Sequence, residues 1–281
     1  MANIRIITDS ASDMPVDYRE DVTVVPLHVR FGTEEYLDGV NLSHREFYEK
    51  LIENEELPTT SQVAPYAFED VYEKARQAGE QVIVITISGR LSGSYQSACI
   101  AASDYEDMVH VVDSENVTVG ERALVEYAIR LKDAGNDIDT IVNTIDREKM
   151  NIHVVGLLDT LEYLKRGGRI SKTVAFVGGM LSIKPVISIE AGEVALLGKA
   201  RGSKQGNNLL VQQIEKAGGI DFSKPLYLGY AGLDDTLLQK YITDSAHLWK
   251  EHADSLDIMS VGGAIGTHVG PGAIAVAFFA L

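Results

Sequence analysis

The chain has 281 residues, of which 45% are hydrophobic and 23% are charged, and its formal net charge is −16. This length exceeds that of an average domain, and the composition is that of a soluble globular protein, so we expect two domains. The negative charge argues against nucleic acid as a partner and against binding to anionic membranes, because the electrostatic contribution would be repulsive.

The single cysteine, Cys99, rules out a disulfide within the chain and fits a reducing cytoplasm, which is the predicted location. The N-terminal residues lack the apolar core of a signal peptide and predict a strand instead. The longest apolar run, residues 273–281, is too short to cross a bilayer. We therefore expect a soluble monomer without an integral membrane segment.

In the first half of the chain, predicted strands alternate with predicted helices. The strands and extended segments are expected at residues 4–7, 22–31, 82–87 and 108–112. A capping box at Ser43 and Glu46 predicts a helix to about Asn54, and further helices should end before Gly79 and Gly135. This alternation predicts an α/β domain with a parallel sheet, to which we assign residues 1–155. Residues 58–65 are predicted to be a loop.

The second half of the chain, residues 156–281, has a different pattern. Two apolar segments, 184–189 and 194–197, read as a strand pair, and helices are expected near 203–216 and 235–252. Further strands are expected at residues 226–230, 258–261 and 273–279. This predicts an α+β domain with an antiparallel or mixed sheet.

Motifs for common cofactors and metals are missing from the sequence. There is no phosphate-binding loop of the G-x-x-x-x-G-K-[ST] type and no H-E-x-x-H, and the seven histidines lack metal-ligand spacing. We therefore expect no cofactor and no metal. Ser92 does not lie in a G-x-S-x-G motif, because Arg90 occupies the position of the first glycine.

Four polar segments that contain glycine or hydroxyl residues remain as candidate binding loops. They are residues 59–62, 88–94, 167–171 and 266–272. The segment 88–94 joins a buried strand to a helix, so its amides and hydroxyls could bind an anion, although Ser92 could equally be a helix cap. Each of the other segments, taken alone, could be an ordinary turn or surface loop.

Taken together and in order, these segments resemble the DegV family of bacterial fatty-acid-binding proteins. The matching motifs, quoted by their first and last residues, are Thr8–Ser10, Pro58–Gln62, Leu91–Ala98, Leu164–Ser171, Ile183–Pro185 and His268–Ala273. The resemblance implies the two-domain DegV fold, with a fatty acid buried in a tunnel between the domains. It also implies a carrier that presents the acid to a separate fatty acid kinase, which makes the acyl phosphate, and that does no chemistry itself.

The resemblance also implies roles for individual residues. Thr60, Ser92 and His268 match the positions that contact the fatty-acid carboxylate, and Ser61, Gly93 and Ser94 are expected neighbours. Arg169 matches a position for docking the kinase. Basic residues gather around it and again later in the chain, which adds Arg166 and Arg201 as docking candidates beside Lys165, Lys172, Lys199 and Lys204.

Two other functions remain open from the residues alone. Ser92 and His268 could form a nucleophile–base pair in a serine-dependent acyl hydrolase or transferase. The chain could also be a small-molecule sensor that holds no lipid. The basic clusters could simply be solvated surface.

Overall fold

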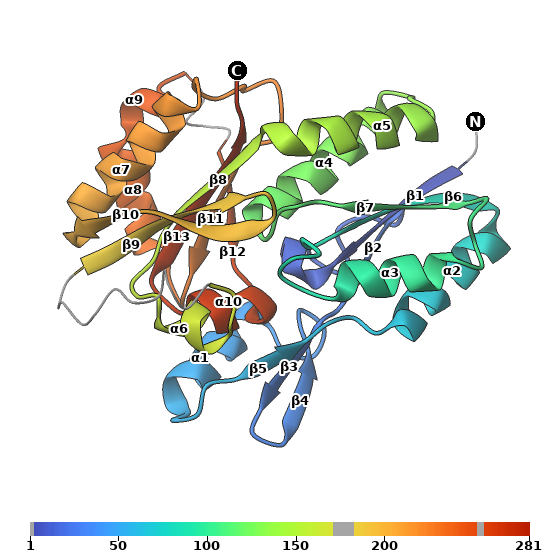
Figure 1. Cartoon of the computed structure of the whole chain (residues 1–281), viewed down its shortest axis with the longest axis horizontal. Helices are drawn as coiled ribbons and strands as arrows, with labels where there is room; N and C mark the ends of the chain where they lie inside the picture. The colour runs from blue at the N-terminus through green and yellow to red at the C-terminus, as the bar shows by residue number, and fades with distance from the viewer. Residues whose placement is uncertain (1–2, 171–182, 252–255) are drawn as a thin grey trace.

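The computed structural model describes residues 3–170, 183–251 and 256–281, and these form three β-sheets flanked by helices (Figure 1). One sheet is parallel and four-stranded, in the order β2-β1-β6-β7. Its strands are β1 (Asn3–Asp9), β2 (Val22–Val25), β6 (Glu80–Thr86) and β7 (Val109–Asp113). The parallel sheet predicted for the first half of the chain is confirmed.

Helices cover both faces of the parallel sheet, as strand–helix alternation requires (Figure 1). One face is covered by α2 (Pro65–Ala78) and α3 (Ser94–Ala102), and the other by α4 (Val119–Asp133) and α5 (Ile138–Glu148). The short 3-10 turns are η1 (Ser10–Ser12) and η2 (Lys149–Asn151). Because both faces are covered, residues 82–86 of β6 are fully buried.

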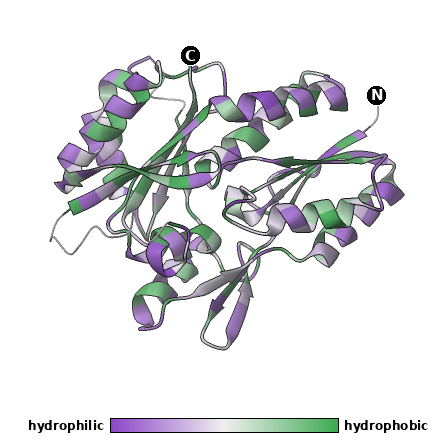
Figure 2. Cartoon of the chain, viewed as in Figure 1, coloured by the Kyte–Doolittle hydropathy of each residue, from purple (hydrophilic) through white to green (hydrophobic). Residues whose placement is uncertain are grey.

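The second sheet is six-stranded and mixed, in the order β10-β9-β8-β13-β11-β12. Its strands are β8 (Ile152–Leu157), β9 (Ile183–Glu190), β10 (Glu193–Arg201), β11 (Tyr227–Ala231), β12 (Asp257–Ser260) and β13 (Ala273–Phe279). Its outer side carries α7 (Gly202–Lys216), α8 (Thr236–Asp244) and α9 (Ala246–Trp249). Helix α4 contacts this sheet and also the parallel sheet, so it lies between the two. The strands are largely hydrophobic, whereas the outer helices alternate between hydrophobic and hydrophilic residues (Figure 2).

A third, three-stranded sheet has the order β4-β3-β5. It consists of β3 (His28–Phe31), β4 (Glu34–Leu37) and β5 (Thr59–Ser61). The helices α1 (His44–Glu53), α6 (Glu162–Arg166) and α10 (Gly263–Val269) lie beside it (Figure 1). Helix α10 contacts α1, α6, β3 and β5, so it joins the end of the chain to this small sheet.

Three local predictions differ from the structure. The extended segment 22–31 divides into β2 and β3, which belong to different sheets, and Pro26 between them has no N–H for a strand ladder. The predicted loop 58–65 contains β5, which pairs with β3. His268 lies on helix α10 and not in a loop. The domain boundary between residues 155 and 156 stays a prediction; both residues belong to β8, which pairs with β9 and β13.

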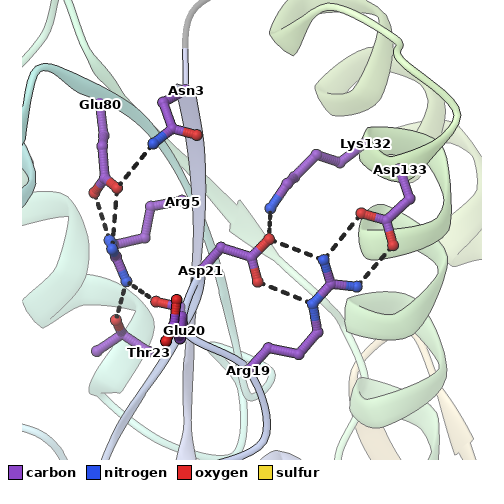
Figure 3. A network of polar contacts seen from close by, with 9 residues as sticks. All are labelled: Asn3, Arg5, Arg19, Glu20, Asp21, Thr23, Glu80, Lys132 and Asp133. Carbon is purple, nitrogen blue, oxygen red and sulfur yellow. Dashed lines mark hydrogen bonds and ion pairs between the residues drawn. The ribbon is translucent and has the colours of Figure 1, made fainter.

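Polar contacts link neighbouring strands of the parallel sheet and connect the sheet region to α4 (Figure 3). The Arg5 guanidinium bridges β1 to Glu80 of β6 and donates to the Thr23 hydroxyl of β2. Arg19 pairs with Asp21 and also with Asp133 of α4. The pairs of Arg19 are partly exposed, and such ion pairs contribute about 0–1 kcal/mol each, so the buried core remains the main source of stability.

Candidate ligand-binding cavity

A cavity lies between the carboxyl ends of the parallel strands, helix α10 and one face of the six-stranded sheet. Its empty space is about 930 Å³, part of which is open to solvent. Its walls are mostly aliphatic, and they include Leu27, Ile87, Leu91, Leu158, Leu164, Val261, Ile265 and Val269.

The sheet face that forms one wall carries unusually small residues. Gly156 of β8, Ala275 of β13 and Gly229 of β11 are register partners in neighbouring strands, and all three line the cavity. A β-carbon at Gly229 would lie 2.7 Å from Cγ1 of Val119, so a side chain there would clash with α4. Glycine weakens a strand interior and marks a close approach. Here the missing side chain of Gly229 lets α4 pack directly on β11, and the three small residues form part of one cavity wall.

Polar side chains gather at one end of the cavity. Thr60 of β5 and His268 of α10 are 2.8 Å apart, measured from Oγ1 to Nε2. Ser61, Gln62, Ser92 and Arg169 also line the cavity. Four of the predicted site residues, Thr60, Ser61, Ser92 and His268, therefore share one cavity with Arg169. Among the described residues that line it, Arg169 carries the one formal charge when His268 is neutral.

The side chain of Arg169 spans two segments at this polar end. Its Nε donates to the backbone oxygen of Leu91 at 3.2 Å, and a terminal nitrogen donates to the oxygen of Gly167 at 2.5 Å. The guanidinium thus links the end of α6 to the loop between β6 and α3. The sequence predicted Arg169 only as a docking residue, and the structure also places it against the cavity.

Two aspartates at strand ends fix the loop between β6 and α3. Asp9 accepts hydrogen bonds from the amides of Ala11 and Ile87, both at 3.0 Å. Asp113 accepts from the amide of Gly89 at 3.1 Å. The carboxyl ends of parallel strands lie along one edge of the sheet, so both aspartates reach this loop. Neither lines the cavity; they hold the loop that carries Ser92.

Ser92 lies one residue before Gly93, the N-cap of α3. Its Oγ accepts a hydrogen bond from the amide of Ser94, the first residue of α3, at 3.2 Å, and the side chain also lines the cavity. Gly93 and Ser94 lie behind it and do not line the cavity. The Ser94 hydroxyl is buried and accepts from the amide of Val63 at 3.1 Å. A β-carbon at Gly93 would overlap Gln62, at 1.9 Å from Oε1.

Helix α10 is held at its N-terminus by two buried aspartate side chains, which the sequence analysis did not identify as functional. Asp13 accepts from the amide of Gly262 at 2.8 Å, and Asp38 accepts from the amide of Gly263 at 2.8 Å. Their second oxygens accept from the hydroxyls of Thr118 at 2.7 Å and of Ser10 at 2.9 Å, respectively. Carboxylates favour this end of a helix because its amides are otherwise unsatisfied. They hold the helix that carries His268.

Burial alters the proton affinity of these groups. Desolvation raises the pKa of Asp13 to about 8 and that of Asp9 to about 7. Desolvation, followed by the positive charge of Arg169, lowers the pKa of His268 to about 4. His268 is therefore neutral near pH 7. Its Nδ1 is buried and has no hydrogen-bond partner within the part of the chain that the structure describes.

The remaining docking candidates lie on separate elements. Arg166 is exposed on α6 and pairs with Glu162 at 2.8 Å. Arg201 is exposed at the end of β10. Lys172, and Ser171 of the Leu164–Ser171 motif, lie outside the described residues.

The nucleophile–base pair of Ser92 and His268 is not formed. The Nε2 of His268 is hydrogen-bonded to Thr60, its Nδ1 faces no partner among the described residues, and the Ser92 hydroxyl is within hydrogen-bonding distance of Ser94. A serine nucleophile needs a base within hydrogen-bonding reach. The geometry therefore gives the acyl hydrolase hypothesis no support.

Known proteins share this architecture along the whole chain. The profile of a family described as uncharacterised proteins of the DegV family matches residues 3–281. This chain belongs to the DegV family. A DegV domain-containing protein of Caldanaerobacter subterraneus subsp. tengcongensis is 35% identical over 283 residues, covering 99% of each chain.

Solved structures of DegV proteins have the same fold. A fatty-acid-binding DegV family protein from Thermus thermophilus has a TM-score of 0.88 and 32% identity, covering 99% of this chain and 100% of that one. A stearic-acid-binding protein from Eubacterium ventriosum has a TM-score of 0.83 and 27% identity, covering 99% and 98%. The predicted DegV-like fold, with a parallel and a mixed sheet, is confirmed.

Across residues 3–170, 183–251 and 256–281, none of the helices combines the length and hydrophobicity that crossing a bilayer requires. The same ranges contain no cluster of three or more His, Cys, Asp or Glu residues placed to ligate a metal ion.

Proposed function

We propose that this chain binds a long-chain fatty acid in the cavity, with the carboxylate at Thr60, Ser92 and His268. The observation that carries the proposal is the arrangement of the lining: aliphatic walls with the hydroxyls, the imidazole and Arg169 together at one end. The related protein from Thermus thermophilus binds a fatty acid, which supports the same ligand class here.

The aliphatic walls supply most of the affinity. Each buried methylene contributes about 0.8 kcal/mol, so a chain of about 16 carbons gains on the order of 10 kcal/mol before ordering costs are subtracted. The polar end has only to replace the water lost by the carboxylate. Hydrogen bonds to a charged acceptor contribute about 1.5–3 kcal/mol each, so a few donors are sufficient.

The proton on His268 decides what Thr60 can donate. With the proton on Nε2, His268 donates to the Thr60 oxygen, and the hydroxyl proton of Thr60 is free for the ligand carboxylate. This tautomer places the proton of the imidazole in a hydrogen bond and leaves only a lone pair at the unpartnered Nδ1. Ser92 provides a second hydroxyl, and Ser61 lies beside Thr60 on β5. Gly93 and Ser94 support the loop from behind.

We further propose that the bound acid is presented to a separate fatty acid kinase and that this chain does no chemistry itself. The Leu164–Ser171 motif and the place of Arg169 beside the polar end support this, because a partner that contacts Arg169 would be close to the carboxylate. Arg166 and Arg201 are candidate contacts at the rim. We place the carrier in the cytoplasm as a monomer.

The direct test is mass spectrometry of the purified protein, first intact under native conditions and then after organic extraction. We expect one equivalent of a fatty acid, or uptake of one equivalent of added oleate. A ligand-free mass that does not shift with oleate would contradict the proposal and leave the sensor hypothesis. A serine-directed phosphonate should not label Ser92.

A further inference from the structure

The cavity ends, on the side away from its polar residues, at a wall made by two side chains. A second groove lies beyond it, and Val154 and Ile189 are the two residues that line both spaces. The ladder between β8 and β9 ends where Val155 faces Ser188, and Val154 and Ile189 are the next residue of each strand beyond this last pair.

The path of the chain shows that this wall is far from the polar end of the cavity. Leu158, Gly156 and Val154 line the cavity at alternate positions along β8 and the residue that follows it. Beyond Leu158 the chain enters α6, which leads to Arg169, and α10 with His268 leads into the adjacent end of β13. At about 3.3 Å per residue, Val154 is roughly 13 Å further along the strand than Leu158.

The groove beyond the wall has a mixed lining, unlike the mostly aliphatic cavity. Charged residues such as Glu115, Lys149 and Glu190 stand there beside apolar ones such as Met150 and Leu197. Lys149 is already paired with Glu115 at 3.3 Å and with Asp146 at 2.8 Å. A methyl end that passed the wall would leave aliphatic surroundings for a groove that also holds charged side chains, so each further methylene would gain less.

The wall cannot retract toward α4. A β-carbon on Gly120 would lie 2.5 Å from Cγ2 of Val154, so the valine already packs directly on the helix backbone. Val154 itself is 5% exposed. On the basis of the proposed function, we infer that Val154 and Ile189 set the longest acyl chain that the cavity accepts.

The test compares the double variant Val154→Ala/Ile189→Ala with the wild type and with Val155→Ala. Val155 is buried on the opposite face of β8, against α7, and its truncation removes the same two methyl groups as that of Val154. Each protein is delipidated, refolding is checked by circular dichroism, and Kd is measured for saturated acids of 12 to 22 carbons.

In the double variant, we expect the preferred length to increase by about two carbons. Each methylene that gains an apolar site tightens binding about fourfold, so two of them raise the affinity ratio of the longer acid to the wild-type optimum about fifteenfold. Val155→Ala should keep the wild-type profile. If the double variant does not fold, Ile189→Phe is measured, and it should shift the preference to shorter acids.

Two negative results have different meanings. If the wild type binds no acid of any length, the proposed function has failed. If the wild type binds fatty acids and the wall variants keep its length profile, the inference about Val154 and Ile189 is overturned while the proposed function stands.

Discussion

The Oγ1 atom of Thr60 lies 2.8 Å from Nε2 of His268, although 208 positions separate the two residues in sequence. The hydrogen bond joins β5 of the small sheet to α10, which comes from near the C-terminus. Both side chains line the cavity, so this contact forms part of its polar end. It also makes the two residues interdependent, because the tautomer of one sets the donor available on the other.

Replacing Thr60 by valine should weaken fatty-acid binding at least tenfold, because a hydrogen bond to the charged carboxylate contributes about 1.5–3 kcal/mol. Valine keeps the shape of threonine and removes the hydroxyl. The control is Thr59→Val, since Thr59 is the exposed neighbour on β5 and does not line the cavity. Kd for oleate, measured by calorimetry, should separate the two variants, and equal values would remove Thr60 from the carboxylate site.

The two serines flanking Gly93 should respond in different ways to alanine substitution. Ser92→Ala should lower fatty-acid occupancy, because its hydroxyl lines the cavity, and should cost only about 0.5–1 kcal/mol of stability through the lost acceptor for the part-buried amide of Ser94. Ser94→Ala should lower the free energy of unfolding by about 1–3 kcal/mol, because it leaves the buried amide of Val63 without an acceptor. Urea unfolding and lipid extraction on both variants test this, and a shared loss of lipid with unchanged stability would contradict the assignment.

Asp38→Asn should loosen helix α10. Both oxygens of Asp38 accept hydrogen bonds, from Gly263 and from Ser10, and an asparagine amide group cannot accept at both positions. We expect a loss of about 1–3 kcal/mol in the free energy of unfolding. Asp17→Asn, at an exposed position, is the control. A change no larger than that of the control would mean that Asp38 is protonated in the fold and does not act as a carboxylate.

The pH dependence of stability should carry a contribution from His268. Its pKa falls from about 6.5 in the unfolded chain to about 4 in the fold, so the unfolded chain binds more protons between these values. The free energy of unfolding should therefore decrease as the pH falls from 6.5 to 4, by up to about 3 kcal/mol from this residue.

The buried carboxyl groups change the free energy of unfolding with pH in the opposite direction. The contribution of His268 must therefore be measured as the difference between the wild type and a variant without this histidine. The raised pKa of Asp9 and of Asp13 means that folding takes up protons between pH 4 and 8, and these groups stabilise the fold as the pH falls. Subtracting the profile of His268→Gln from that of the wild type cancels this contribution. A difference that stays flat from pH 7 to pH 4 would show that His268 does not titrate with a lowered pKa.

Arg169→Ala should separate lipid binding from transfer to the kinase. We expect the variant to retain a bound acid and to lose kinase-dependent acyl phosphate formation, because the walls supply the affinity and the guanidinium lies beside the carboxylate end. Arg147→Ala, on the exposed face of α5, is the control for general charge loss. If Arg169→Ala also loses the acid, Arg169 belongs to the binding site and the docking assignment is wrong.

Local sequence signals predicted most of the first sheet and the ends of its helices. The capping box of Ser43 and Glu46 is present at the start of α1, and Gly79 ends α2 with a φ of 69°. These features depend on neighbouring residues, so they can be recognised in a short window. The extended segment 22–31 was only partly understood, because the assignment of β2 and β3 to different sheets depends on distant partners.

The functions of the buried aspartates could not be predicted in the same way. Asp9 was visible as a polar strand end, but its role in holding Ile87 depends on the pairing of β1 with β6. Asp13 and Asp38 meet α10 only because the end of the chain returns to the small sheet. The sequence did contain a signal for the face of the six-stranded sheet that lines the cavity. Gly156 and Gly229 interrupt apolar strands, and a glycine inside a strand marks a close approach of another part of the protein.

By itself, the sequence determined the chemistry of the site and the family to which the chain belongs. Hydroxyls, a histidine and an arginine were present in ordered motifs, and such groups keep their donor properties in any fold. The tertiary structure decided which of them meet. It placed Thr60 against His268 and Arg169 against Leu91, and it turned Ser94 away to Val63. The reason is that strand register and helix packing set distances between residues far apart in sequence, and a hydrogen bond forms or is lost within about 1 Å.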